Sequence, residues 1–279
     1  MHKMEHESIQ KFKEYLVEQE RSAATVEKYG HALERFCQHL SAGSGVDKVR
    51  VIQYKELLAQ QFAPASVNAT LAALNGFFRF VGWPDCVVKP LHIQRRVFVS
   101  ADKELSREEY KRLVAAAQQK SDTRLALLLQ LMASTGIRVS EIPYVTAEAV
   151  AEKVIRIRLK GKIRTILLPD KLCSQLKQYQ KEKQITAGPL FLTRSGHVMS
   201  RKEVWAQMKR LCRSAGVPDS KVFPHNLRHL FARTFYKVTR DVAQLADVLG
   251  HSSIETTRIY LISTGAEHAR TMAGLRLVS

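Results

Sequence analysis

Helical periodicity runs through both ends of this chain and is lost between residues 82 and 104. The interruption contains a basic pair and three helix breakers, Gly82, Pro84 and Pro90. Residues of this kind end helices, so we expect a domain boundary here. The expected organisation is a first domain at residues 1–90, a linker at 91–104 and a second domain at 105–279.

The first domain is predicted to be a compact bundle of four helices. Apolar residues recur at helical spacing from Ile9 to Val17 and again from Val26 to Leu40. A third helix is expected at about residues 47–60. The fourth is expected to begin after Pro64, with Ser66 as its N-cap.

The second domain is predicted to be mostly helical, with one short β insertion. It begins with a capping-box pattern, Ser106 followed by Glu109. Further along, apolar and basic residues alternate from Val154 to Lys160, which predicts a strand with one apolar and one basic face. Gly161-Lys162 then turns the chain into a second strand, Ile163 to Leu168.

This hairpin is expected to present a lysine at its tip with arginines behind it. Such a basic hairpin suits a DNA groove, and its candidate DNA contacts are Arg156, Arg158, Lys162 and Arg164. The alternative is a solvated face that is basic only because the whole chain is basic.

The charge balance of the chain favours a polyanionic partner. There are 44 Lys and Arg against 26 Asp and Glu, which gives a formal net charge of +18. DNA or RNA is the first expectation, and an anionic membrane surface the second. The apolar run from Leu125 to Leu129 is too short to span a bilayer, and the N-terminus lacks a signal-peptide core, so we expect a cytoplasmic protein with no membrane association. The four cysteines are too widely spaced for a disulfide framework or a zinc knuckle.

The C-terminal half carries a series of basic residues followed by one tyrosine. Gly136 is expected to end a buried helix and so hold Arg138 at a helix junction. Pro224 starts another helix, which places His225, Arg228 and His229 near one face. A histidine pair four residues apart also suits zinc, but no acidic residue lies between the two and no third ligand is near, so phosphate contact is favoured.

A further helix is expected to stop at Gly250 and deliver His251 into a loop, with Tyr260 about two turns into the next helix. Taken singly, Tyr260 reads as a core residue. Taken together with the arginines and histidines, it predicts attack on a phosphodiester by a hydroxyl nucleophile without a metal.

These motifs resemble those of the tyrosine recombinases, the family of phage-type integrases and Xer-like enzymes. The resemblance covers nearly the whole chain, including a helical core-binding domain at Ser22–Thr25 with Tyr29 and at Ala65–Phe80. The second-domain motifs are, in chain order, Thr135–Glu141, Lys160–Lys162, the H-x-L-R-H box His225–His229, and Leu249–Ser252 followed by Tyr260.

The resemblance implies a mainly α fold with a small β-sheet insertion: a two-domain clamp of a SAM-like core-binding domain and a mixed α/β catalytic domain. It implies a site-specific DNA recombinase that needs no metal, ATP or other cofactor. Arg138 and Arg228 would hold the scissile phosphate, and Tyr260 would form a 3′-phosphotyrosyl bond. Lys160 would be the general acid, while His225 and His251 would orient the phosphate and assist proton transfer.

The resemblance also implies double-stranded DNA as partner and a homo-tetramer on two DNA sites, coupled by the C-terminal tail. The tail has a helical pattern from Ala266 to Leu275 and docks either onto a neighbouring protomer or onto its own domain. The hairpin is about a residue longer than usual, so Lys162 is an alternative acid, and Pro143 stands where the family often has leucine. The lack of a separate arm-binding domain favours a Xer-like or transposon-encoded enzyme.

Other functions stay open from the sequence. A type IB topoisomerase shares the tyrosine, arginine, lysine and histidine set, and a regulator could keep the fold without catalysis. A basic protein that binds RNA or membranes is a more distant alternative.

Overall fold

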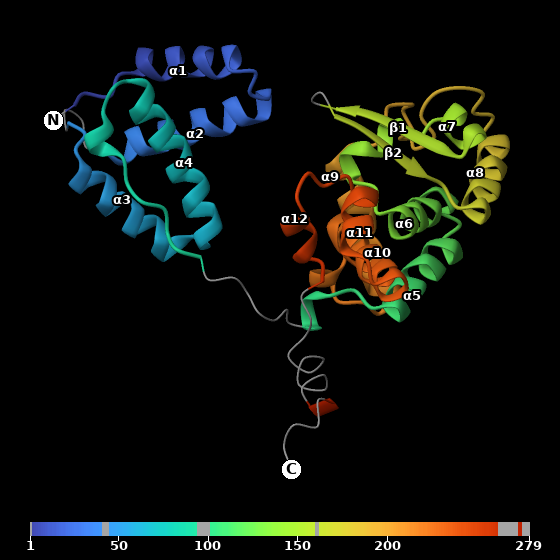
Figure 1. Ribbon diagram of the computed structural model, residues 1–279. Helices are drawn as coiled ribbons and strands as arrows, with labels where there is room; N and C mark the ends of the chain where they lie inside the picture. Colours follow the sequence, from blue (N-terminus) through green and yellow to red (C-terminus); the bar gives the residue numbers. More distant parts are fainter. Residues whose placement is uncertain (1, 41–44, 94–100, 160–161, 262–272, 275–279) are drawn as a thin grey trace. The chain divides into compact units, whose positions relative to one another are not determined.

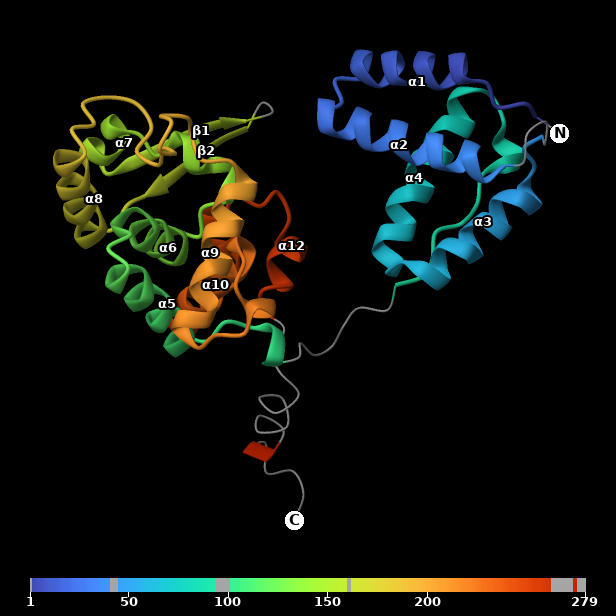
Figure 2. The ribbon, with the colours of Figure 1, turned by 180° about the vertical axis from the view of Figure 1, so that it is seen from behind.

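The computed structural model describes residues 2–40, 45–93, 101–159, 162–261 and 273–274, with only the backbone at 101, 159 and 162. It divides into two compact units, Met1–Arg95 and Arg96–Ser279, shown from opposite sides in Figures 1 and 2. No helix among these residues is both long and apolar enough to cross a membrane.

Unit 1 is the predicted four-helix bundle. Its elements are α1 (His6–Glu18), α2 (Ala23–His39), α3 (Lys48–Gln61), α4 (Pro64–Phe80) and the short 3-10 helix η1 (Pro84–Cys86). Its core is aromatic, with Phe12, Phe36, Phe77 and Phe78 almost fully buried. The fourth helix begins two residues earlier than expected. Pro64 is its first residue, a position where the missing N–H of proline has no helical partner to lose.

Unit 2 is mostly helical, with one two-stranded β-hairpin among its described residues. Its elements are η2 (Ala101–Lys103), α5 (Arg107–Gln119), α6 (Thr123–Thr135), η3 (Val139–Tyr144), α7 (Ala147–Glu152), β1 (Val154–Leu159), β2 (Lys162–Leu167), α8 (Asp170–Glu182), α9 (Arg201–Ala215), η4 (Asp219–Lys221), α10 (Pro224–Thr239), α11 (Val242–Leu249) and α12 (Ile254–Arg258). The apolar helix α6 is buried on nearly all sides and lies between the hairpin and α5 (Figures 1 and 2). It contacts α10 directly, which brings the carboxyl end of α6 to the predicted active-site helix.

Several predicted helix ends are confirmed. Ser106 and Glu109 form the capping box of α5, and Pro224 is the first residue of α10. Gly136 and Gly250 end α6 and α11 in the left-handed conformation, with φ of 62° and 64°. One expectation was wrong. Tyr260 does not lie two turns into a helix, because α12 stops at Arg258 and the tyrosine follows its end.

The hairpin confirms the prediction for one strand and corrects it for the other. In β1 the isoleucines Ile155 and Ile157 are buried and the two arginines are exposed, as predicted. Strand β2 pairs antiparallel with β1, and Arg164 lies opposite Ile157. Directly opposite residues share a face, so Arg164 is buried at 9% exposure while Ile163 is 71% exposed. Arg164 therefore does not belong to the exposed basic face on which it was predicted to contact DNA.

Candidate active site

Five of the six predicted site residues meet in unit 2. Arg138 follows α6, His225 and Arg228 lie near the start of α10, His251 follows α11, and Tyr260 follows α12. Arg228 donates from Nε to the Tyr260 hydroxyl at 3.4 Å and from a terminal nitrogen to His251 Nε2 at 2.9 Å. The ring centroids of His251 and His225 lie 5.6 and 5.5 Å from that of Tyr260.

The two arginines are held by the carboxyl ends of two helices. The last carbonyls of a helix have no partner within it and carry the negative end of the helix dipole. Arg228 donates to the carbonyl of Gly136, at the end of α6, and to that of Leu249, at the end of α11, at 2.8 Å. Arg138 donates to the carbonyl of Gly250 at 3.4 Å. The helix ends thus fix both guanidinium groups before any substrate binds.

Glu141 also holds Arg138 in place. Its carboxylate is almost fully buried and accepts from the Arg138 guanidinium at 2.9 Å and from the Arg138 backbone N–H at 2.8 Å. Arg138 itself keeps 38% of its side chain exposed, so it can still meet a ligand from solvent. No role for Glu141 was predicted from the sequence. The signal that could have revealed it is its place three residues after Arg138, the spacing of a capping box.

The histidines around Tyr260 are neutral near pH 7. Burial, then the charges of Arg228 and Arg138, lower the pKa of His251 to about 4. Because Arg228 donates to Nε2, the proton of His251 lies on Nδ1, where it can be donated to Thr257 Oγ1 at 2.8 Å. Burial and His225 lower the pKa of His229 to about 4, and its ring packs against Tyr260 at 4.4 Å. Desolvation and Arg228 also lower the pKa of His225.

Positive charge is concentrated at this site. Arg228 is only 2% exposed, and burial together with Arg138 lowers its pKa to about 10, opposed by its hydrogen bond with Tyr260. It therefore stays charged at neutral pH. Fixed, partly desolvated arginines are what a site needs to stabilise an anion such as a phosphate.

A pocket of about 380 Å³ opens beside these groups. Arg138, His225 and Arg228 line it, together with two residues that were not predicted from the sequence, Arg201 and Trp205 of α9. Trp205 is 49% exposed, and Lys209 lies over its ring at 5.1 Å. The α9 segment carries no motif beyond its capping box, so no sequence signal pointed to these two side chains.

Neither candidate general acid can be placed. Lys160 lies outside the described residues, and only the backbone of Lys162 is described. The strand ends that flank residues 160–161 lie on the same side of unit 2 as α12 in both views (Figures 1 and 2).

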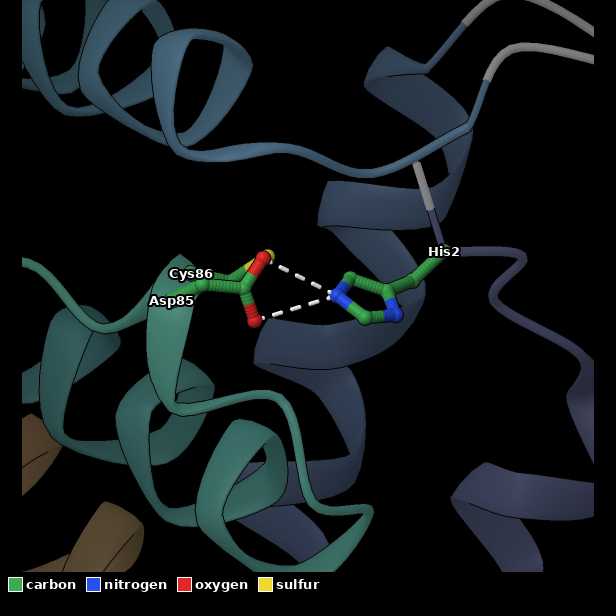
Figure 3. Close-up of side chains that lie close together, drawn as sticks. All are labelled: His2, Asp85 and Cys86. Atoms are coloured by element: carbon green, nitrogen blue, oxygen red, sulfur yellow. Dashed lines mark hydrogen bonds and ion pairs between the residues drawn. The ribbon is translucent and has the colours of Figure 1, made fainter.

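Within the described residues, one group of three possible metal donors lies close together, and it belongs to unit 1 (Figure 3). His2 Nε2 lies 3.0 Å from both carboxylate oxygens of Asp85, which is the geometry of an ion pair. The buried Cys86 donates to the same carboxylate at 3.8 Å, and burial beside Asp85 raises its pKa to about 11. These contacts satisfy the three groups and tie the start of the chain to the end of the bundle.

Both units of the chain match known protein families. Residues 103–267 match the phage integrase family, and residues 9–83 match the phage integrase N-terminal SAM-like domain. The tyrosine recombinase XerA of Pyrococcus furiosus is 30% identical over 271 residues, which cover 95% of this chain and 92% of the relative.

Two solved structures share the fold. One is the XerH site-specific recombinase bound to its difH substrate, with a TM-score of 0.67 and 20% identity, covering 96% of this chain and 84% of that one. The other is a lambda integrase tetramer bound to a Holliday junction, with a TM-score of 0.72 and 17% identity, covering 91% and 76%. With both of its domains matched and a relative of 30% identity aligned over 95% of its length, this chain belongs to the phage integrase family, the tyrosine recombinases.

Proposed function

We propose that this site-specific DNA recombinase cuts one strand by attack of Tyr260 on a phosphodiester. The Tyr260 oxygen loses its proton and bonds to phosphorus, while the bond from phosphorus to the 5′-oxygen breaks. The products are a 3′-phosphotyrosyl bond and a 5′-hydroxyl. A 5′-hydroxyl from a partner strand reverses the step and reseals the DNA. The observation that carries this proposal is the convergence of Arg138, Arg228 and Tyr260 at the ends of α6 and α11.

The roles of the side chains follow from their charges. Arg138 and Arg228 neutralise the charge that develops on the non-bridging phosphate oxygens, so no metal is required for that task. His225 and His251 have lowered pKa values, so they are neutral near pH 7. His251 accepts from Arg228 through Nε2 and so helps to orient the phosphate-binding arginine, which leaves His225 to accept the proton of Tyr260. Lys160 protonates the leaving 5′-oxygen, with Lys162 as the alternative acid.

The rest of the chain supplies DNA binding and assembly. Unit 1 serves as the core-binding domain, and the two units close around a duplex as a clamp. The exposed Arg156 and Arg158 of β1, with Lys162, add contacts to the DNA. The C-terminal tail docks onto a neighbouring protomer in a homo-tetramer on two sites. The enzyme acts on DNA in the cytoplasm.

Strand exchange between two sites tests this function against topoisomerase activity. A plasmid would carry two copies of the DNA that flanks the gene of this protein, and its products would be resolved on a gel. We expect deletion or inversion products with the wild type and none with Tyr260→Phe. Relaxation of supercoils without exchange would instead support the topoisomerase, and DNA binding without cleavage would support a silent regulator.

A modified leaving group tests the general acid. A 5′-bridging phosphorothiolate leaves as a thiolate and needs little protonation. We expect Lys160→Ala to cleave an ordinary phosphodiester roughly 100-fold more slowly and to recover on the phosphorothiolate. Lys162→Ala is the matched variant, and recovery of that variant alone would move the acid to Lys162.

A further inference from the structure

Arg164 makes contacts that the chemistry above does not use. It lies on β2, and its side chain is 8% exposed. One terminal nitrogen donates to Glu141 Oε2 at 2.6 Å, and the other donates to the carbonyl of Val248 at 3.0 Å. Its side-chain stem lies so close to Gly250 that an added Cβ there would stand 2.5 Å from Arg164 Cδ.

These contacts link the groups that position three site residues, Arg138, Arg228 and His251. Glu141 holds Arg138, and Val248 immediately precedes Leu249, whose carbonyl holds Arg228. Gly250 accepts from Arg138 and leads into His251. The guanidinium of Arg164 thus ties the strand after the hairpin turn to the carboxylate and to the helix end that orient the phosphate-binding groups.

Stability alone is a weak explanation for this arrangement. The free energy lost when an arginine and a carboxylate leave water is about as large as the free energy gained when they pair. An apolar side chain on the buried face often stabilises a fold as well as such a pair does. Arg164 Nε is also buried with no hydrogen-bond partner among the described residues, a further cost. Burial lowers the pKa of the Arg164 guanidinium, whereas the charge and hydrogen bond of Glu141 raise it. The ion pair with Glu141 therefore favours the charged form of a buried side chain.

We infer that Arg164 is a positioning residue. Through Glu141 it fixes the position of the Arg138 guanidinium, and through the end of α11 it fixes the position of the loop that carries His251. The inference rests on the proposed cleavage by Tyr260. Arg164 itself does not touch the DNA. Its loss lets Arg138 shift away from the phosphate, and a displacement of about 1 Å costs on the order of 100-fold in rate.

The test compares two substrates in single-turnover cleavage. One is a nicked duplex with an ordinary phosphodiester. The other carries a methylphosphonate at the scissile position, which has no negative charge for Arg138 to neutralise. We expect Arg164→Met to lose about 100-fold on the phosphodiester and no more than about 10-fold on the methylphosphonate. Arg213→Met removes one exposed arginine from α9 and should leave the ratio between the substrates at the wild-type value.

Arg164→Lys keeps the test decisive if Arg164→Met fails to fold. A lysine keeps the charge but lacks the planar fork that reaches Glu141 and Val248 together, so part of the same substrate-dependent loss should remain. Equal losses on both substrates would mean a purely structural role and overturn the inference, as would wild-type rates on both. If the wild-type protein forms no adduct on either substrate, the proposed function is contradicted, and the inference with it.

Discussion

At the scale of single residues, the site is built from backbone carbonyls as much as from side chains. Arg138 and Arg228 bind carbonyl oxygens at the ends of α6 and α11, so their positions depend on where those helices stop. The order of motifs predicted both arginines and Tyr260. It gave no role to Glu141. It also predicted the wrong face for Arg164, because residues 163–168 do not alternate cleanly and strand pairing decides which face each residue takes.

The buried histidines predict a loss of stability in mild acid. His229 and His251 have a folded-state pKa of about 4, below the 6.5 of an unfolded histidine. Between these values the unfolded chain binds more protons, so the free energy of unfolding falls as pH drops from 6.5 to 4. One pKa unit corresponds to about 1.4 kcal/mol, and partial exposure reduces this, so we expect a loss of roughly 2 kcal/mol.

Urea unfolding at several pH values between 7 and 4 measures this loss. His229→Gln removes one of the two groups and should flatten the pH dependence. A variant with the same slope as the wild type would show that His229 is already protonated in the folded protein at pH 5.

At the scale of elements, the helix ends matter more than the helix interiors. The sequence predicted the stops at Gly136 and Gly250 because only glycine adopts positive φ easily. It did not predict the end of α12 before Tyr260, since residues 254–264 contain no glycine or proline to mark a stop. That end is set by tertiary contacts, including the packing of Tyr260 against the histidines.

Gly250→Ala tests the helix end, with Gly216→Ala as its control. Both glycines end a helix at positive φ, and an alanine there costs about 1 kcal/mol. Among the described residues, a Cβ at Gly216 meets nothing within 4 Å, whereas one at Gly250 presses on Arg164. We expect both variants to lose similar backbone stability in urea unfolding, but only Gly250→Ala to lose DNA cleavage, by about 10-fold or more. Equal cleavage by the two variants would show that the contact with Arg164 is unimportant.

At the scale of the whole molecule, periodicity and breakers predicted two units of which the first is a four-helix bundle. The structure divides the chain between Arg95 and Arg96, inside the segment expected as linker. The tail pattern from Ala266 to Leu275 falls outside the described residues except at 273–274, so its docking stays a prediction. Assembly depends on contacts with other chains, which no pattern within one chain specifies.

The net charge of +18 predicts DNA binding that is strongly salt-dependent. Each phosphate that the protein neutralises releases condensed counterions, so the affinity falls steeply as salt rises. For six or more phosphate contacts, we expect Kd for a non-specific duplex to rise about 1000-fold or more between 50 and 200 mM salt. Fluorescence anisotropy measures this change. A Kd that barely changes over that range would contradict an electrostatic mode of binding.

Covalent capture of DNA tests the central claim, that Tyr260 is the nucleophile. The protein would be incubated with nicked duplexes from the DNA beside its gene, and the products separated on a denaturing gel and mapped by peptide mass. We expect a wild-type adduct on the 3′-phosphate at Tyr260, with a free 5′-hydroxyl on the other fragment. Tyr260→Phe should bind the duplex with similar affinity and form no adduct. An adduct that persists in Tyr260→Phe, or maps to another residue, would contradict the account.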